Sequence, residues 1–330
     1  MTSLYLKPFF EHDLSSLSFL ITGGGGFIGS HIVEYLLLHG AKRVRAIDDF
    51  STGFRSNVAP FLTHPAFELL EGDLRHYPTC QQACAGIDIV CHQAAIGSVP
   101  RSIQNPDYTT SVNVDGFVNI VKAAKEQGIK RVVYASSSSV YGSEPTLPKV
   151  EERIGKPLSP YAVSKYAAEL YAGVFAQVYG MDFIGLRYFN VFGPRQSPKG
   201  AYAAVIPLFI DGLLRQEPVY INGNGDQTRD FTFITNVVQV NIRAMLTNNP
   251  DALNQVYNVA VGERFSVLAL YQMLSEILQS NSQPVFRNSR SGDIEHSLAD
   301  ISKAQKLLQY HPLVSFKEGL QITVSYVSGK

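Results

Sequence analysis

Tyr161 and Lys165 are the residues of this chain best suited to acid–base chemistry. Their spacing of four places both side chains on one face of a helix that we predict to begin at Pro160. Free tyrosine has a pKa of about 10, too high for a base at neutral pH, and a nearby ammonium group lowers it. A lone Tyr-x-x-x-Lys pair is more often packing beside a solvated lysine, so its surroundings must decide its role.

A predicted strand over residues 132–135 ends in four serines, residues 136–139, shortly before this pair. In doubly wound sheets the chemistry lies beyond the carboxyl ends of the strands. A serine hydroxyl can contact the same substrate oxygen as Tyr161. Such a trio can take a proton from an alcohol while the alcohol carbon gives a hydride to a nicotinamide.

Four consecutive glycines lie between a predicted strand and a predicted helix. Gly24, Gly26 and Gly29 fit the spacing G-x-G-x-x-G, whereas Gly23, Gly26 and Gly29 fit G-x-x-G-x-x-G. A turn without side chains lets the backbone approach a pyrophosphate, and the helix that follows offers N–H groups to it. Either spacing therefore predicts a dinucleotide site.

Acidic residues follow the next two predicted strands. Asp48 ends the second strand, where a carboxylate accepts hydrogen bonds from an adenosine ribose and repels a 2′-phosphate. This favours NAD over NADP, and Asp49 is the competing candidate one residue away. Asp73 follows the third strand, where it can face the edge of an adenine.

Elements that position these residues alternate between strand and helix. Apolar runs predict strands over 18–22, 44–47, 67–70, 87–90 and 132–135, with a helix over 27–39 after the first. Strands separated by helices pair in parallel, with helices on both faces. We predict an α/β fold: a Rossmann-type doubly wound parallel sheet over residues 1–190, including a short N-terminal extension.

The chain becomes less regular, and richer in Pro, Gly and Asn, from about Asn190. A strand is predicted over 255–259 and a helix over 267–278. Residues 191–330 are therefore expected to form a smaller C-terminal substrate-binding α/β lobe, from which the chain partly crosses back to the first domain.

Composition excludes several classes of partner. Among 330 residues, 28 Lys and Arg balance 28 Asp and Glu, which argues against nucleic-acid and membrane-surface binding. No stretch approaches the roughly 18 apolar residues of a membrane helix. Three cysteines without a second Cys/His pair indicate neither a disulfide framework nor a metal site. A cytoplasmic protein is expected.

Several motifs in order resemble the extended short-chain dehydrogenase/reductase family. They are Thr-Gly-Gly-x-Gly-Phe-Ile-Gly at 22–29, Gly-Asp-Leu at 72–74, His-Gln-Ala-Ala at 92–95, Asn-Val-Asp-Gly at 113–116, Ser-Ser-Val-Tyr-Gly at 138–142, Tyr-x-x-x-Lys at 161–165 and Arg-Tyr-Phe-Asn-Val-Phe-Gly-Pro at 187–194. Within the family the chain is most similar to the UDP-sugar 4-epimerases. Gly-Ser-Val-Pro-Arg-Ser at 97–102 and Ala-Tyr-Ala-Ala-Val-Ile-Pro at 201–207 favour the bacterial UDP-N-acetylglucosamine 4-epimerases.

This resemblance implies Tyr161, Lys165 and Ser137 as catalytic residues and NAD as the cofactor. The implied NAD contacts are Gly23, Gly26, Phe27, Ile28, Gly29, Asp48, Asp49, Phe50, Ser51, Thr52, Gly53, Asp73, Leu74, Gln93, Ala94, Ala95, Asn113, Tyr161, Lys165 and Tyr188. The implied UDP-sugar contacts are Gly97, Ser98, Ser137, Ser138, Ser139, Asn190, Gln196, Ala204, Val205, Tyr220, Asn222, Arg229, Arg264, Arg290, Asp293 and Ser297. No metal is implied.

Several of these positions bear on the substrate. Arg229 and Arg290 match the family's diphosphate-binding arginines. Ser297 stands where relatives restricted to UDP-glucose and UDP-galactose carry a bulky ring, so a small residue leaves room for an N-acetyl group; Gly97 likewise offers space near the sugar. Selectivity set elsewhere in the pocket remains an alternative. Where family dehydratases carry an Asp-Glu pair, this chain has Ser138 and Ser139.

The resemblance implies inversion at carbon 4 of a UDP-hexose, above all UDP-N-acetylglucosamine to UDP-N-acetylgalactosamine, through a 4-keto intermediate. UDP-glucose, UDP-glucuronate and UDP-N-acetylglucosaminuronate are alternative substrates. A net NAD-linked UDP-sugar oxidoreductase or decarboxylase and a non-catalytic NAD-binding protein are the alternative functions. Family members usually form homodimers through two helices, here expected within 103–127 and 160–179.

Overall fold

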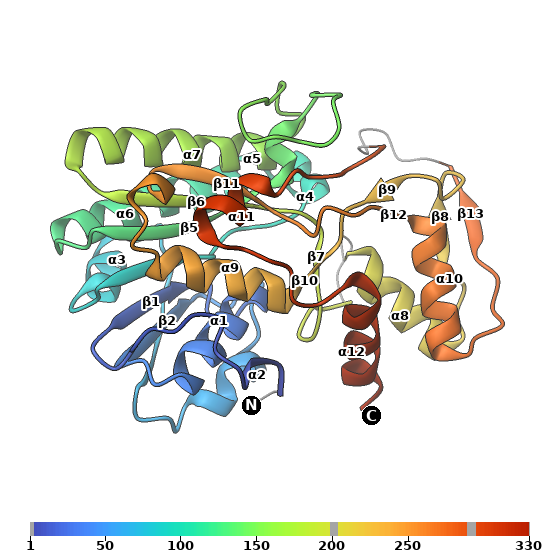
Figure 1. Ribbon diagram of the computed structural model, residues 1–330, viewed down its shortest axis with the longest axis horizontal. Coiled ribbons are helices and arrows are strands. Elements are labelled where there is room, and N and C mark those ends of the chain that lie inside the picture. Colours follow the sequence, from blue (N-terminus) through green and yellow to red (C-terminus); the bar gives the residue numbers. More distant parts are fainter. Residues whose placement is uncertain (1–2, 199–203, 289–294, 330) are drawn as a thin grey trace.

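Seven parallel strands form the central sheet of the computed structural model, which describes residues 3–198, 204–288 and 295–329 (Figure 1). The strands are β1 (Ser18–Thr22), β2 (Arg43–Asp48), β3 (Phe67–Glu71), β4 (Ile89–His92), β5 (Arg131–Ser137), β6 (Asp182–Tyr188) and β11 (Gln255–Val259). Their order in the sheet is β11-β6-β5-β4-β1-β2-β3. The strand order reverses between β1 and β4, so the predicted Rossmann-type doubly wound sheet is confirmed.

Helices cover both faces of this sheet because its buried strands are apolar on both sides. Phe19 and Ile21 of β1 pack with the core beneath α1 and α9, whereas Leu20 packs with the core beneath α3, α6 and α7. The helices around the sheet are α1 (Phe27–Leu38), α2 (Arg55–Val58), α3 (Tyr77–Cys84), α4 (Val99–Gln104), α5 (Pro106–Thr110), α6 (Gly116–Glu126), α7 (Pro160–Tyr179), α9 (Ile234–Leu246) and α11 (Ser302–Leu308). Shorter helical turns lie at Ser3–Tyr5, Ala59–Phe61, Ser111–Asp115, Ser138–Tyr141 and Pro250–Ala252. No helix in the described ranges is long and apolar enough to cross a membrane.

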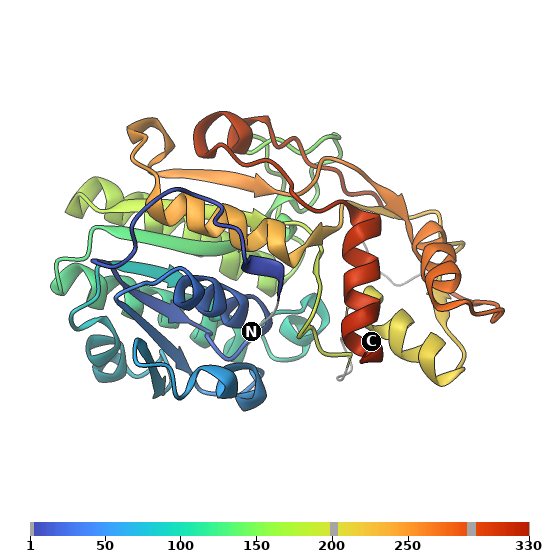
Figure 2. The same ribbon diagram turned by 60° about the horizontal axis from the view of Figure 1, so that its bottom comes forward.

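A smaller second lobe is built from three helices and short strand pairs. Its helices are α8 (Val205–Arg215), α10 (Val267–Leu278) and α12 (Phe316–Ser328). Its pairs are β7 (Val191–Phe192) with β10 (Thr232–Phe233), β9 (Thr228–Arg229) with β12 (Phe265–Ser266), and β8 (Tyr220–Asn222) with β13 (Val285–Arg287). Figure 2 shows α12 standing between the sheet and the α8 and α10 helices. There Phe316 stacks on Phe231 and Phe265 with ring centroids 5.0 and 4.5 Å apart, which packs α12 against the strand pairs of this lobe.

The C-terminal half of the chain returns to the first sheet twice. Helix α9 covers one face of the sheet, and the strand predicted over 255–259 is β11, which pairs with β6 at the edge of the sheet (Figure 1). Chain position therefore does not separate the lobes cleanly. The boundary near residue 190 remains a prediction about where the sugar-binding part begins.

The N-terminal extension packs along α1. Tyr5 is fully buried, and its hydroxyl donates to Nδ1 of His31 at 2.7 Å. The other ring nitrogen, Nε2, lies 2.9 Å from the Pro194 carbonyl oxygen and donates to it. Burial lowers the pKa of His31 to about 3, so the ring is neutral and can accept at one nitrogen and donate at the other. The extension thus ties α1 to the segment that leads into the second lobe.

Candidate active site

A cleft of about 370 Å³ opens at the carboxyl ends of the parallel strands. It lies where the strand order reverses, the position at which open α/β sheets bind ligands. Every strand from β1 to β6 sends the residues that follow or end it into the wall. The lining residues are Gly23, Gly26, Phe27, Ile28, Gly29, Ile47, Asp48, Asp49, Ser51, Thr52, Gly53, Gly72, Asp73, Leu74, Gln93, Ala94, Ala95, Ile96, Gly97, Val112, Ala135, Ser136, Tyr161, Lys165 and Tyr188.

The glycine turn approaches the cleft through Gly23, Gly26 and Gly29. Gly24 is absent from the lining, and a Cβ there would meet the Ala46 side chain at 2.5 Å. Gly23 has a φ of +68°, and a Cβ on Gly29 would lie 2.1 Å from the Gly23 carbonyl oxygen. Of the two spacings read in the sequence, the geometry therefore selects the wider one, G-x-x-G-x-x-G, for the residues that face the cleft.

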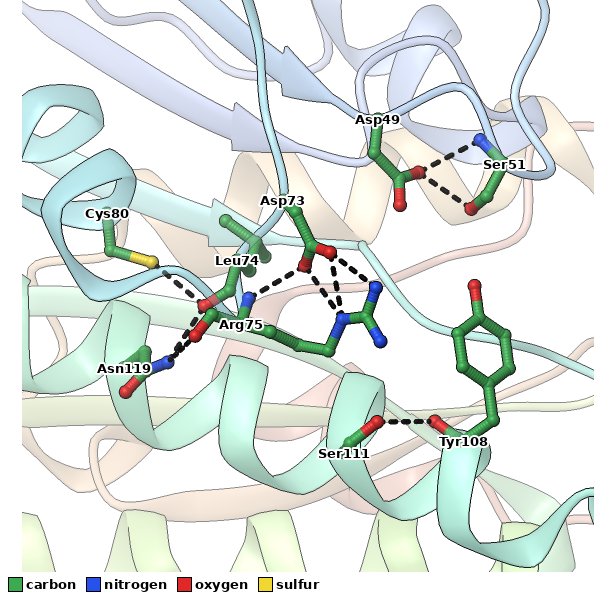
Figure 3. A network of polar contacts seen from close by, with 9 residues as sticks. All are labelled: Asp49, Ser51, Asp73, Leu74, Arg75, Cys80, Tyr108, Ser111 and Asn119. Atoms are coloured by element: carbon green, nitrogen blue, oxygen red, sulfur yellow. Dashed lines mark hydrogen bonds and ion pairs between the residues drawn. The ribbon is translucent and has the colours of Figure 1, made fainter.

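Asp48 and Asp49 both line the cleft but differ in their surroundings. Asp48 is buried, and its carboxylate accepts hydrogen bonds of 2.8 Å from the backbone N–H groups of Gly25 and Phe50. Burial raises the pKa of Asp48 against the effect of these bonds. Asp49 is exposed and accepts from the N–H and hydroxyl of Ser51 (Figure 3). A carboxylate has about four lone-pair sites, so Asp48 can hold the glycine turn and still accept from a ribose.

A second network fixes Asp73 at the same end of the cleft. Both oxygens of its carboxylate accept from the Arg75 guanidinium, and Nε of Arg75 lies 2.8 Å from Oδ2. The side-chain hydrogen bonds from Arg75 lower the pKa of Asp73. The Arg75 guanidinium carbon in turn lies 5.3 Å from the centre of the Tyr108 ring. The guanidinium is therefore placed between Asp73 and Tyr108 (Figure 3). Asn119 and Cys80 both donate to the Leu74 carbonyl oxygen, which fixes the backbone beside Asp73.

The loop after β4 is fixed by hydrogen bonds to Thr22 at the end of β1. The Thr22 hydroxyl accepts from the N–H groups of Gln93 and Ala94, and its own proton points to Nδ1 of His92. His92 is fully buried, and burial lowers its pKa to about 3, so its ring accepts as a neutral base.

Two residues implied as NAD contacts do not line the cleft. The Asn113 side chain accepts from the Ile96 N–H at 2.7 Å and donates to the Ile96 carbonyl and to Ser164, so it positions the loop of the cofactor cleft from behind. The Phe50 ring lies under the Arg55 guanidinium, at 4.4 Å, and against the glycine turn, where a Cβ on Gly25 would meet it at 2.7 Å. Both residues therefore support the loops that form the wall, and their contacts with NAD stay predictions.

Tyr161 and Lys165 lie at the inner end of the cleft because α7 begins there. Ser159 caps the helix by accepting from the Ala162 N–H at 3.1 Å, and Pro160 starts its first turn. The Lys165 ammonium donates to the Ala135 carbonyl at the end of β5, 2.9 Å away, and lies 6.0 Å from the centre of the Tyr161 ring. Burial lowers the pKa of Lys165 to about 8. Burial raises the pKa of Tyr161, and a hydrogen bond with the Ser137 side chain lowers it.

Beneath the serine run lies a buried ion pair that sequence reasoning missed. Ser136 donates to Oε1 of Glu169 at 2.5 Å, and Arg187 binds the same carboxylate through two nitrogens at 2.9 and 2.8 Å. Both charged side chains are almost fully buried. This pair fixes the end of β5 next to Ser137. Glu169 stands eight residues after Tyr161, two helical turns along the face that carries Tyr161 and Lys165, and this spacing could have revealed it.

Tyr188 joins the cleft to the second half of the chain. Its hydroxyl lies 3.0 Å from Oε1 of Gln93 and 2.8 Å from Nδ2 of Asn241 in α9. Asn241 also accepts from Nε2 of Gln93 at 3.0 Å. The sequence did not predict Asn241 as part of the site, because no motif or spacing in α9 distinguishes it from the other buried residues of that helix. Six further lining residues were missed, all beside expected positions at strand ends or in the adjoining helical turn: Ile47, Gly72, Ile96, Val112, Ala135 and Ser136.

Several residues expected to contact the sugar nucleotide lie in or beside the second lobe. The Ser297 hydroxyl and Oε1 of Gln196 are buried and lack a hydrogen-bond partner among the described residues. Arg229 donates to the Thr228 and Glu295 carbonyls, and Asn190 donates to the Asp230 carbonyl.

The remaining expected positions are spread more widely. Ser98 caps α4, and Ser139 donates to Ser137 at 3.0 Å within the turn that also holds Ser138. Ala204 and Val205 begin α8, and Asn222 ends β8. The Tyr220 ring lies against Arg287, and Arg264 is exposed, whereas Gly97 lines the cleft. Arg290 and Asp293 lie outside the described residues.

The cleft fits an adenine dinucleotide. Gly26 caps α1 without a side-chain bond, so the first N–H groups of this helix face the glycine-lined wall. Side chains at Gly23 or Gly29 would collide with backbone, so this wall keeps the close approach that a pyrophosphate needs. Asp48 and Asp73 at one end and Lys165 at the other supply the polar ends of such a site.

Comparison with known proteins agrees with this geometry. Residues 19–260 match the NAD dependent epimerase/dehydratase family. A UDP-glucose 4-epimerase of Mycolicibacterium smegmatis is 34% identical over 313 residues, covering 94% of this chain and 98% of that protein. The structure of Thermotoga maritima UDP-glucose 4-epimerase with UDP-glucose has a TM-score of 0.89 at 33% identity and covers 95% of this chain and 99% of that one. UDP-N-acetylglucosamine 4-epimerase of Methanobrevibacter ruminantium, in complex with UDP-N-acetylmuramic acid, has a TM-score of 0.89 at 37% identity, with 95% and 98% covered.

Proposed function

The chain belongs to the NAD dependent epimerase/dehydratase family, and from this we propose that it inverts carbon 4 of a UDP-hexose, with UDP-N-acetylglucosamine as preferred substrate. The observation that carries the proposal is the half-buried Tyr161 beside the buried Lys165 at the inner end of the cofactor cleft, with Ser137 hydrogen-bonded to Tyr161. Relatives that share nearly the whole chain are named as UDP-sugar 4-epimerases.

Tyr161 is the general base for the sugar 4-hydroxyl. The buried Lys165 ammonium stabilises the tyrosinate, and the Ser137 hydroxyl donates a hydrogen bond to the Tyr161 oxygen. Bound NAD supplies the acceptor, and afterwards the donor, of the hydride at carbon 4. Tyr161 holds the abstracted proton and returns it to the oxygen after the 4-keto sugar has turned its other face to the cofactor, which inverts the configuration.

The second lobe holds the uridine diphosphate. Arg229 projects from β9 and Arg264 lies just before β12, the strand that pairs with β9, so both guanidinium groups belong to one antiparallel pair. Planar guanidinium groups match the oxygens of a diphosphate. Asn190 and Gln196, on the segment between the lobes, would contact the sugar or its phosphates. Arg290 and Asp293 are proposed as further UDP-sugar contacts from the sequence resemblance alone.

Preference for an acetylated sugar rests on Ser297. Its side chain is small, and its buried hydroxyl has no partner among the described residues. A buried hydroxyl left unpaired costs about 1–3 kcal/mol, so an acetamido group that pairs with it would be favoured over a sugar without one. A carboxylate at carbon 6 or a plain hydroxyl at carbon 2 defines the alternative substrates, UDP-glucuronate and UDP-glucose.

We also propose a homodimer formed through α7. Val163, Leu170, Val174 and Val178 are each more than half exposed. Their spacing of seven, four and four places them on one stripe of the helix. A stripe of this kind on a helix that also carries the catalytic pair fits a helix-to-helix interface between two copies.

The test incubates the purified protein with UDP-N-acetylglucosamine and no added NAD, and follows the sugar by proton NMR. We expect the galacto isomer to appear, up to an equilibrium mixture, without accumulation of NADH at 340 nm. UDP-glucose and UDP-glucuronate are run in parallel, and the proposal requires the largest kcat/KM for the acetylated sugar. Turnover that requires added NAD and accumulates NADH would establish a net oxidoreductase. A Tyr161→Phe variant as active as the native chain would exclude Tyr161 as the base.

A further inference from the structure

Asp230 is a fully buried carboxylate between β9 and β10, in the lobe proposed to hold the sugar nucleotide. Its Oδ1 accepts from the Val261 N–H at 3.0 Å. Its Oδ2 accepts from the N–H groups of Gly262 at 3.1 Å and Ala299 at 3.3 Å. One side chain therefore gathers backbone from two segments that lie about 30 and 70 residues later in the chain.

The Asp230 backbone adds a third segment. Its carbonyl oxygen accepts from Nδ2 of Asn190 at 2.8 Å, and the Asn190 carbonyl accepts from the Thr232 N–H at 3.2 Å. Next to this junction, the Thr228 carbonyl accepts from the Ser297 N–H at 3.0 Å. The segments of Asn190 and Ser297 are thus bonded to the backbone of residues 228–232, which carries the carboxylate.

Each of these segments carries a residue assigned to the UDP-sugar. Arg229 is the neighbour of Asp230, and Asn190 is bonded to its carbonyl. Arg264 follows Gly262 by two residues, and Ser297 precedes Ala299 by two. Moving any one segment by an ångström would separate the groups that must meet the diphosphate, the sugar and its acetyl group at once.

An apolar residue of similar size would fill this space but leave three backbone N–H groups without an acceptor. A carboxylate is the side chain that can accept all three, since it has acceptor sites on both oxygens and no donor. Its ionisation is costly here: burial raises the pKa of Asp230 to about 7 although the three N–H groups lower it. Because ionising a buried carboxylate costs free energy, its presence where three chain segments meet indicates that Asp230 fixes the positions of these segments and does more than fill space.

We propose that the Asp230 side chain is a positioning group for substrate, which holds the segments of Arg264 and Ser297 in their binding arrangement beside Arg229 by accepting from backbone N–H groups of the 261–262 turn and of Ala299. The proposal rests on the proposed function for the identity of the substrate. It concerns affinity for the uridine diphosphate end, because among the described residues no hydrogen bond of Asp230 reaches Tyr161, Lys165 or the cofactor cleft.

The test substitutes Asp230→Asn, which keeps the size but turns one acceptor into a donor facing an N–H group. We expect the Kd for UDP, measured by calorimetry, and the KM for the UDP-sugar to rise at least tenfold. The content of bound NAD and kcat should stay within about threefold of the native chain, a split that general unfolding would not give. Asp226→Asn is the matched control, since Asp226 is exposed in the same lobe and bonds only its neighbour Asn224 in the described contacts.

A Kd and KM within twofold of the native values in the Asp230→Asn protein would overturn the proposal. If that variant does not fold, hydrogen exchange of the native protein decides: the amides of Val261, Gly262 and Ala299 must exchange at least a hundredfold more slowly than those of exposed turns, and fast exchange there contradicts the clamp. UDP binding is independent of turnover, so a native chain that binds UDP but epimerises no sugar would refute the proposed function and still leave the Asp230 measurement decisive.

Discussion

The carboxylate of Asp48 accepts a hydrogen bond of 2.8 Å from the backbone N–H of Gly25, in the middle of the glycine turn. The same carboxylate bonds the Phe50 N–H, and a Cβ on Gly53 would lie 2.9 Å from its Oδ1. One acid at the end of β2 therefore shapes two loops of the cofactor cleft before any ligand arrives. Asp48 therefore has a structural role in addition to the ribose contact proposed for it.

Replacing Asp48 should accordingly cost both cofactor and stability. In Asp48→Ala two charge-assisted bonds are lost, which we expect to lower the free energy of unfolding by about 2–4 kcal/mol. Bound NAD, measured by absorbance after release from the purified protein, should fall at least tenfold. Asp49→Ala is the control and should keep its stability, because Asp49 bonds only the adjacent Ser51 in the described contacts. Loss of NAD in Asp49→Ala alone would assign the ribose to Asp49.

Lys165 should make the protein more active at the expense of stability. Its pKa is about 8 in the folded protein against about 10.5 when unfolded, so the unfolded state binds more protons between these values. The free energy of unfolding should thus rise with pH from 8 to 10.5, and the cost of burying the charge is fully present below pH 8. Lys165→Met should gain about 2–3 kcal/mol at pH 7 in urea unfolding and lose at least a hundredfold in kcat. The exposed Lys317→Met should change neither, and a Lys165→Met protein less stable than native would contradict the direction of the shift.

The acetyl preference should depend on the room at Ser297. In Ser297→Tyr we expect kcat/KM for UDP-N-acetylglucosamine to fall at least tenfold while that for UDP-glucose changes less than threefold, because a ring displaces the acetamido group. The two substrates measured on one variant form their own control. Equal losses for both would remove Ser297 from the specificity of the site.

The N-terminal extension should stabilise the native fold through a single hydroxyl. Tyr5→Phe leaves the ring in place but deprives Nδ1 of the buried His31 of its donor. We expect a loss of about 1–2 kcal/mol in the free energy of unfolding, by urea titration at pH 7. The neighbouring Leu6 is 72% exposed, and Leu6→Ala should be neutral. A neutral Tyr5→Phe would mean that the extension packs through its rings alone.

The exposed stripe of α7 should control association. Val174→Asp places a charge in the proposed interface and is expected to yield monomers by light scattering coupled to gel filtration, with the native chain running as a dimer. Val285→Asp, on an exposed strand of the second lobe, changes a similarly exposed valine and should leave the dimer intact. A native chain that is monomeric at micromolar concentration would refute the dimer directly.

Local pattern predicted the elements closely. The structure has the strand at 18–22 and the helix at 267–278 where apolar spacing placed them, and the sheet is doubly wound as the alternation of elements required. Tyr161 and Lys165 could be paired in advance because four residues along a helix fix two side chains on one face. Residues that lie close together in the sequence can therefore be predicted to act together before the fold is known.

Contacts between distant residues were decided by tertiary structure alone. Asn113 bonds Ile96 and Ser164, 17 and 51 residues away, and no local pattern predicted these bonds. Asn241 reaches Gln93 across 148 residues, and no period in α9 distinguishes it from its buried neighbours. The sequence by itself determined the kind of sheet, the glycine turn and the pairing of Tyr161 with Lys165, because these follow from short-range sterics and helical or strand periodicity. Which buried polar groups satisfy one another depends on how the chain returns to its own sheet, and only the folded packing decides that.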